Sequence, residues 1–265
     1  MKRFLVLLTV LFAFSSCNEY QKAMKSEDVA LKFTTATKLY DKADYNRAIL
    51  LIEQIAPAFR GKPQAEKLFY MYSQSLYQTK QYGLAAFQFE SFTSTYPKSE
   101  KAEETFFLSA KCFAKMSPKY TLDQTDTNKA LAKIQEYIDR YPESQNMTEA
   151  NEMTVVLRNK LEQKAFENAK QFNTISDYKA SLIALENFIT DFPGTPLKED
   201  ALYYKLDSAY LLAINSVPSK MEERLTNAKI AYDKLIKFNS ETKYKSKADK
   251  MLATIDKELQ QFSKK

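Results

Sequence analysis

Side chains that could carry out acid–base, metal or thiol chemistry are scarce in this chain. Its 265 residues include no histidine and two cysteines, so the commonest general base and the commonest zinc ligand are both absent. Cys112 is the single thiol outside the N-terminal segment, and one thiol can form neither an intrachain disulfide nor a cysteine zinc site. The carboxylate pairs Glu103–Glu104 and Glu222–Glu223 fall on predicted helix faces without a histidine or a glycine-shaped cleft, so we interpret them as solvated charge. The sequence therefore predicts no catalytic residue, no metal site and no cofactor.

Glycine is nearly absent, and this limits the fold. Gly61, Gly83 and Gly194 stand far apart, whereas a phosphate-binding loop needs several glycines close together. Hairpins, bulges and close strand–helix turns also need glycine, because it adopts positive φ without steric cost. The composition excludes a Rossmann domain, a P-loop and most β-sandwiches. It predicts an all-helical protein that is not an enzyme.

The N-terminus has the pattern of a secretion signal that ends at a cysteine. Lys2 and Arg3 precede an 11-residue run, Phe4–Phe14, that is apolar except for one threonine. This run is too short for a membrane-spanning helix, which needs about 20 residues, and it fits a signal-peptide core. The following Ser15-Ser16-Cys17 resembles a bacterial lipobox. The resemblance implies that residues 1–16 are a signal peptide and that Cys17 carries a diacylglycerol and an N-acyl chain, which together give stable membrane anchoring. An ordinary secretory signal with a chance cysteine is the alternative.

Beyond this segment the chain has a modest positive charge. The formal net charge of +6 becomes +4 once Lys2 and Arg3 are removed, and the lysines are spread without an arginine-rich run. We therefore expect no nucleic-acid partner. Residues 17–25 are predicted to form a short polar, lipid-anchored tether.

A small residue followed by large apolar residues recurs five times. A large apolar residue stands at +4 and +7 in every copy and proline at +12 in three; the small residues are Ala48, Ala85, Ala130, Ser181 and Ala228. A second set of small residues lies upstream of these copies, and each is followed at +3 by a large apolar residue; they are Ala36, Ser73, Ala110, Ala169 and Ser208. This two-helix pattern resembles the tetratricopeptide repeat, in which small residues let two helices approach closely and proline ends the second helix.

The repeats predict an all-α, right-handed α-solenoid of about five tetratricopeptide helix pairs with a C-terminal capping helix. We assign residues 26–143 to N-terminal repeats 1–3, and residues 144–265 to C-terminal repeats 4–5 and the capping helix. Insertions are expected over 116–126 and 215–222, a long helix over 144–172, and the amphipathic cap over 243–262. An irregular helical bundle is the alternative.

The turns between repeats contain a recurrent string. Tyr96-Pro97-Lys98-Ser99 and Tyr141-Pro142-Glu143-Ser144 share Tyr-Pro-x-Ser, and Phe192-Pro193-Gly194-Thr195 varies it. The aromatic residue packs the end of one helix, proline stops that helix, and Ser or Thr caps the next. Together with the lipobox and the five repeats, these turns resemble the BamD family of lipoproteins, which belong to the β-barrel assembly machinery of the bacterial outer membrane. The first turn, Ala58-Phe59-Arg60-Gly61, departs from the pattern and leaves the geometry between repeats 1 and 2 open.

First-helix positions that face neither the second helix nor the next repeat are expected to line a concave groove. Aromatic rings beside amide and ammonium donors suit an extended peptide that has aromatic side chains and a free carboxylate. The predicted peptide-binding groove consists of Phe33, Tyr40, Tyr70, Gln74, Tyr77, Phe107 and Lys111, with Thr37, Gln78, Lys115, Phe166 and Lys170 on related positions. The alternative is that some of these aromatic residues form the core between repeats. Cys112 is predicted to be a small buried hydrophobe.

The family resemblance implies a non-enzymatic scaffold in outer-membrane protein assembly. It implies that the C-terminal repeats bind the barrel-forming subunit BamA, and that unfolded client β-barrels present a C-terminal aromatic strand. It also implies a lipid anchor on the periplasmic face of the outer membrane. The lysine-rich stretch 234–250 is a candidate for the BamA contact, with a solvated face as the alternative. The rival interpretation is another tetratricopeptide envelope lipoprotein, an adaptor in peptidoglycan coordination, secretion or gliding.

Overall fold

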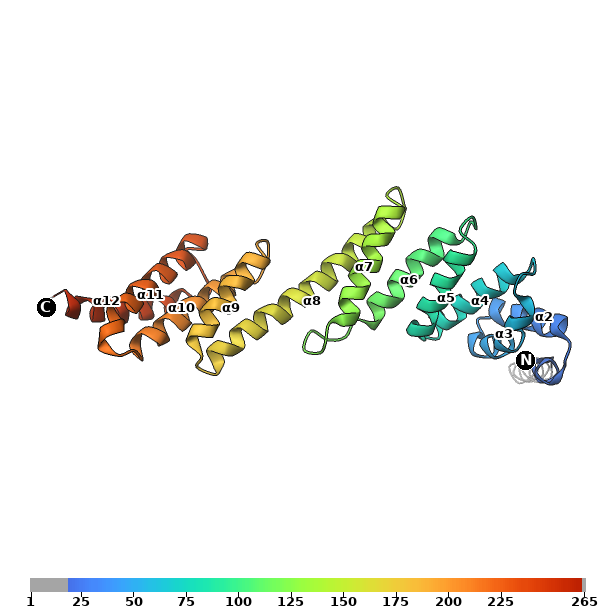
Figure 1. Ribbon diagram of the computed structural model, residues 1–265, viewed down its shortest axis with the longest axis horizontal. Helices are drawn as coiled ribbons and strands as arrows, with labels where there is room; N and C mark the ends of the chain where they lie inside the picture. The colour runs from blue at the N-terminus through green and yellow to red at the C-terminus, as the bar shows by residue number, and fades with distance from the viewer. Residues whose placement is uncertain (1–18, 264–265) are drawn as a thin grey trace, which may run out of the picture. The chain divides into compact units, whose positions relative to one another are not determined.

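The computed structural model describes residues 19–263, and its regular elements there are helices (Figure 1). The predicted signal peptide and Cys17 lie outside the described residues. No β-strand occurs within 19–263, which confirms the all-helical prediction, and no helix in this part of the chain is long and apolar enough to span a membrane. The helices are α2 (Val29–Asp41), α3 (Tyr45–Phe59), α4 (Ala65–Gln78), α5 (Tyr82–Thr95), α6 (Ala102–Met116), α7 (Thr125–Arg140), α8 (Met147–Thr174), α9 (Tyr178–Asp191), α10 (Lys198–Ile214), α11 (Pro218–Phe238) and α12 (Lys245–Phe262).

The chain divides into two compact units. Of the described residues, the first unit holds 19–118 and 123–157, and the second holds 119–122 and 158–263. Each unit has its own buried core, built by α2 to α7 in the first and by α9 to α12 in the second, and α8 contributes residues to both. The units divide inside α8, whereas the division predicted after residue 143 falls in the turn before that helix.

The helices pack as sequential hairpins, and the small residues of the repeat lie where two helices meet. α2 packs on α3, α4 on α5, α6 on α7 and α10 on α11 (Figure 1), and Phe166 and Ala169 of α8 pack with Leu185 and Phe188 of α9. All ten small residues of the pattern are buried, and so are the large residues at +4 and +7 of every second helix. Small side chains let the helix axes approach, and the apolar stripe fills the interface.

The longer segments take three forms. Residues 117–124 are a loop insertion between α6 and α7, and α8 is a single helix of 28 residues, as predicted. The insertion at 215–222 is mostly helix, because Pro218 begins α11, where its fixed φ suits the first turn and its missing N–H is not needed. The predicted capping helix is α12, which packs on α10 and α11.

A Ser or Thr hydroxyl closes the turn that leads into α6, α8, α10 and α12. Its Oγ accepts the backbone N–H two residues later, at 3.0 Å for Ser99, 3.0 Å for Ser144, 3.2 Å for Thr195 and 3.3 Å for Thr242. The α-helix begins three residues after the hydroxyl residue in all four cases, so the hydroxyl caps a lead-in turn rather than the helix itself.

Three of these hydroxyls also join neighbouring repeats. They donate to a glutamate in the first turn of the preceding first helix: Ser99 to Glu66 at 2.6 Å, Ser144 to Glu103 at 2.5 Å and Thr242 to Glu199 at 2.5 Å. A carboxylate is favoured at a helix N-terminus by the helix dipole. Each hydrogen bond therefore fixes the start of one hairpin to the start of the next hairpin or, for Thr242, to the start of the capping helix.

The first inter-repeat turn keeps the same backbone hydrogen bonds without the hydroxyl. The N–H of Lys62 donates to the carbonyl of Phe59 at 2.9 Å, and the N–H of Ala65 donates to that of Lys62 at 3.0 Å. Gly61 supplies a left-handed residue with φ +75°. The departure from Tyr-Pro in the sequence thus leaves the backbone turn intact.

Three tight loops inside hairpins place a non-glycine residue in the left-handed region. Ala43, Lys80 and Ser176 have φ of 59°, 61° and 66°. The next N–H bonds back across the helix end, as from Gln81 to the carbonyl of Leu76 at 2.9 Å, which terminates the first helix. Left-handed backbone costs a non-glycine residue about 1–2 kcal/mol.

Residues 19–25 differ from the polar tether predicted for 17–25. They are helical, and Tyr20 and Ala23 are buried in the core of the first hairpin. The guanidinium of Arg47 lies 5.3 Å from the Tyr20 ring centroid. The tether prediction is wrong for this part, because two apolar residues in a short polar string are too few to indicate a packed helix before the core is known.

Candidate functional site

The seven residues of the predicted groove come from first helices of the first unit, whereas the related positions Phe166 and Lys170 lie in the second unit. Helical spacing of three or four residues places those of each helix on one stripe. Phe33, Tyr40, Tyr70, Tyr77 and Lys111 are half-buried, whereas Gln74 and Phe107 are buried. Five of the seven predicted residues therefore lie at least partly on the surface, and two belong to the core.

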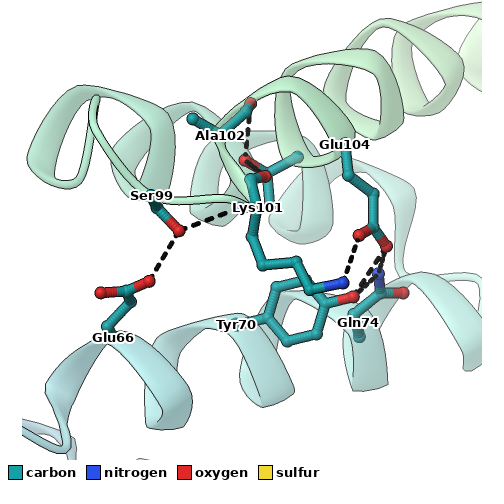
Figure 2. Close-up of polar contacts among 8 residues, drawn as sticks. Glu66, Tyr70, Gln74, Ser99, Lys101, Ala102 and Glu104 are labelled. Atoms are coloured by element: carbon teal, nitrogen blue, oxygen red, sulfur yellow. Dashed lines mark hydrogen bonds and ion pairs between the residues drawn. The ribbon is translucent and has the colours of Figure 1, made fainter.

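A polar cluster between α4 and α6 forms the centre of this surface (Figure 2). The hydroxyl of Tyr70 donates to Glu104 at 2.7 Å. Gln74 Nε2 donates to the same carboxylate at 3.0 Å and to the Tyr70 oxygen at 3.1 Å. Lys101 Nζ lies 2.9 Å from Glu104 and 5.2 Å from the centroid of the Tyr70 ring. These contacts hold the Tyr70 ring between a carboxylate and an ammonium group.

The surroundings further favour the neutral form of Tyr40 and Tyr70, two of the three tyrosines of this surface. Burial raises the pKa of Tyr70, and its hydrogen bond to Glu104 raises that pKa further. Burial also raises the pKa of Tyr40 to about 12, with a smaller contribution from nearby Tyr70. The hydrogen bond to Glu104 raises the pKa of Lys101. At neutral pH the cluster therefore presents phenol and ammonium donors and one carboxylate, a set that can hydrogen-bond a peptide.

A second polar contact lies further along the same stripe. Lys111 Nζ pairs with Glu149 at 2.7 Å and lies 5.3 Å from the Phe107 ring centroid. Tyr77 meets the rings of Tyr82 and Phe89 edge-on. Tyr77 and Lys111 are thus positioned by internal contacts while part of each side chain stays exposed.

Phe107 and Phe166 are core residues, so their predicted place in the groove is wrong and the alternative holds. Each is 4% exposed. Phe107 lies 4.9 Å from Tyr137 and Phe166 lies 5.6 Å from Phe188, measured between ring centroids. These partners are the +7 residues of the second helix, so a ring three residues before the small residue of the first helix fills the hairpin interface. Phe33 also packs toward the core, since its ring stacks on that of Phe59 with 5.0 Å between the ring centroids.

Sequence reasoning missed the acidic partners of the surface. Glu103 and Glu104 are half-buried and hydrogen-bonded rather than simply solvated, because Glu103 accepts from Ser144 and Tyr137 while Glu104 accepts from Tyr70 and Gln74. Their place at the predicted start of a first helix is the feature that could have indicated such a role.

The described residues offer little for metal or thiol chemistry. Among residues 19–263 no group of Cys, Asp and Glu side chains is arranged to hold a metal ion. Cys112 is fully buried in α6, which confirms its predicted core role, and burial raises the pKa of its thiol to about 12.

Comparison with known proteins gives one family and two named relatives. The family model YfiO, described as an outer membrane lipoprotein, matches residues 25–225. The chain is 25% identical over 122 residues to "Outer membrane protein assembly factor BamD" of Caulobacter vibrioides, which covers 46% of this chain and 40% of that protein. It is 32% identical over 89 residues to "Putative outer membrane protein assembly factor BamD" of Aquifex aeolicus, which covers 34% of this chain and 28% of that protein. The matches thus span less than half the length of either relative.

Proposed function

Because the chain belongs to the YfiO family of outer membrane lipoproteins, we propose that it is a non-enzymatic scaffold for the assembly of outer-membrane proteins. The observation that supports this most is the family match over residues 25–225, which spans the helical hairpins from α2 into α11. Both relatives carry names that describe a BamD assembly factor. In this proposal the hairpins form a right-handed tetratricopeptide solenoid, whose surfaces hold partner chains.

The proposed location is the periplasmic face of the outer membrane, with lipid on Cys17. The lipobox-like Ser15-Ser16-Cys17 supports this attachment. The helical segment 19–25 packs on the first hairpin, so a lipid on Cys17 would hold that hairpin within a few residues of the bilayer. Mass spectrometry of the mature N-terminus tests the attachment. An acylated Cys17 supports it, and an unmodified cysteine contradicts it.

The proposed partners are of two kinds. The C-terminal repeats bind a BamA-like barrel protein, for which the family supplies the support. The half-buried first-helix surface around Tyr40, Tyr70, Gln74, Tyr77 and Lys111 binds the C-terminal aromatic strand of client barrels. Its support is the half-buried ring of Tyr70 beside the Lys101 ammonium group, together with the half-buried side chains of Tyr40, Tyr77 and Lys111.

An affinity pulldown tests the scaffold. Tagged full-length protein is purified from detergent-solubilised outer membranes, and the proteins that accompany it are identified by mass spectrometry. We expect stoichiometric recovery of a large barrel protein with repeated periplasmic domains. Recovery of peptidoglycan enzymes or of secretion or gliding components instead would favour the rival adaptor function and contradict the proposal.

Fluorescence anisotropy tests the client surface. A labelled peptide with an aromatic C-terminal residue and a free carboxylate is titrated with the protein. Tyr70→Ala combined with Tyr77→Ala should weaken binding by about tenfold or more, since two contact rings are lost. Leu84→Ala, which removes an exposed apolar side chain of α5 elsewhere in the same unit, is the control and should bind as the wild type does. Equal affinity of the double variant and the wild type would refute the assignment.

A further inference from the structure

Two clefts flank α5, and the second helices α3, α5 and α7 contribute to their lining. The first cleft, of about 570 Å³, lies between α3, α4 and α5, and the second, of about 530 Å³, lies between α5, α6 and α7. α5 lines both clefts, with Phe87 and Ser91 in the first and Glu90 and Ser94 in the second. Neither cleft includes Tyr70, Gln74 or Tyr77. The clefts therefore form a surface separate from the proposed client-binding one.

The first cleft is aromatic and has an exposed anchor. Phe69, Tyr72 and Tyr96 line it, and Phe87 stands in it with 64% of its surface exposed. Tyr72 is fixed in place by donating to Glu53 at 3.0 Å. Full burial of a phenylalanine side chain contributes about 1.5–3 kcal/mol, so covering Phe87 with a large apolar side chain is favourable.

The second cleft contains a guanidinium that is positioned but has no acidic partner. Lys133 of this cleft is neutralised by Glu90 at 2.7 Å and Glu136 at 3.3 Å. Arg140, by contrast, forms no ion pair within residues 19–263, and its guanidinium lies 5.3 Å from the centroid of the Phe106 ring. A ring beneath the guanidinium fixes its plane and leaves its fork of N–H donors for a carboxylate.

The charges favour a protein ligand over a nucleic acid. Arg60, which lines the first cleft, likewise forms no ion pair within residues 19–263. Each cleft therefore combines at least one aromatic ring with one arginine that is not ion-paired. The clefts also contain Glu53, Glu90 and Glu136, which would repel a polyanion. A segment with a single carboxylate avoids most of that repulsion.

We propose that these two clefts are a docking surface for an extended segment of a partner protein. One large apolar side chain of the segment packs on Phe87 and Tyr72, and one carboxylate of the same segment binds the guanidinium of Arg140. This inference concerns a partner other than the client strand, and it does not depend on the proposed client surface.

Peptide titration tests the docking surface. The probes are fluorescein-labelled Gly/Ser peptides that hold one Phe and one Glu, with the spacing between them varied. We expect at least one spacing to bind full-length protein in detergent at least about tenfold more tightly than a peptide of Gly and Ser alone. Phe87→Ser and Arg140→Gln should each weaken that peptide by about tenfold. Changing its Glu to Gln should weaken binding to the wild type but not to Arg140→Gln.

Two matched controls separate the clefts from general surface effects. Leu84→Ser removes another exposed apolar side chain of α5 that lines neither cleft, and Arg158→Gln removes an exposed arginine of α8. Both variants should bind the peptide as the wild type does. The proposal is overturned if no spacing binds more tightly, or if the controls weaken binding equally. It is also overturned if Tyr77→Ala weakens binding while Phe87→Ser does not, because the peptide would then bind the first-helix surface. None of these results changes the outcome expected from the pulldown, which tests the scaffold function separately.

Discussion

Lys80→Gly should stabilise the protein, because Lys80 holds a backbone conformation that suits glycine. Lys80 is the middle residue of the loop between α4 and α5, with φ +61°, and its side chain is exposed. The left-handed conformation costs a non-glycine residue about 1–2 kcal/mol. Glycine gains more freedom in the unfolded chain, which offsets about 0.4–1 kcal/mol of this benefit. The expected net gain in the free energy of unfolding is therefore about 0.5–1 kcal/mol.

Lys80→Ala is the matched control, since it removes the same side chain and keeps the left-handed cost. Urea unfolding followed by far-ultraviolet circular dichroism compares the two variants, and hydrogen exchange of the amides in α4 and α5 reports the local effect. The midpoint should rise for the glycine variant and stay near the wild type for alanine. A glycine variant no more stable than the alanine variant would refute the reasoning. Ala43→Gly should add a similar increment, since Ala43 has φ 59° in the equivalent loop.

Three other perturbations follow from the contacts described above. Ala85→Leu should destabilise the first unit by about 1–3 kcal/mol in urea unfolding, because Ala85 is fully buried where α4 and α5 meet; an unchanged midpoint would mean that the hairpin tolerates wider spacing. Ser144→Ala should cost about 1–2 kcal/mol by the same measurement, since it removes the hydrogen bond to Glu103 and the closure of the turn before α8, and Ser144→Thr should restore most of the loss. Burial and the hydrogen bond to Glu53 raise the pKa of Tyr72 from 10.0 to about 12. The raised pKa contributes stability that is fully present below pH 10 and is lost as pH rises toward about 12, so Tyr72→Phe should lose less stability than the wild type over that interval; equal slopes would contradict this.

The sequence predicted the hairpins because their determinants are local and periodic. A small residue with large residues at +4 and +7 describes one helix face, and that face has one way to be buried in a two-helix unit. The ten small residues, the loop before α7, the 28-residue α8 and the capping helix α12 follow from such patterns. The family resemblance could also be found from the sequence, because each turn string, such as Tyr96-Pro97-Lys98-Ser99, consists of consecutive residues.

The candidate site was predicted only in part, because helical spacing does not say how deep a side chain lies. Tyr70 and Phe107 occupy the same repeat position, three residues before the small residue of a first helix. Tyr70 keeps its hydroxyl edge toward Glu104, whereas Phe107 has no polar atom and is enclosed against Tyr137. The difference depends on residues that are 30 or more positions away in the chain.

The sequence by itself determined that the described chain is helical, that it is built from repeated helix pairs with small residues at their interfaces, and the family to which the chain belongs. Tertiary structure alone decided that Tyr20 and Ala23 join the core, that glutamates at helix starts bind hydroxyls of the next repeat, and that Arg140 is left without a carboxylate. The physical reason is that helix periodicity is a property of neighbouring residues. Burial, hydrogen bonding and charge pairing depend on side chains from other helices, whose approach is fixed only when the hairpins pack.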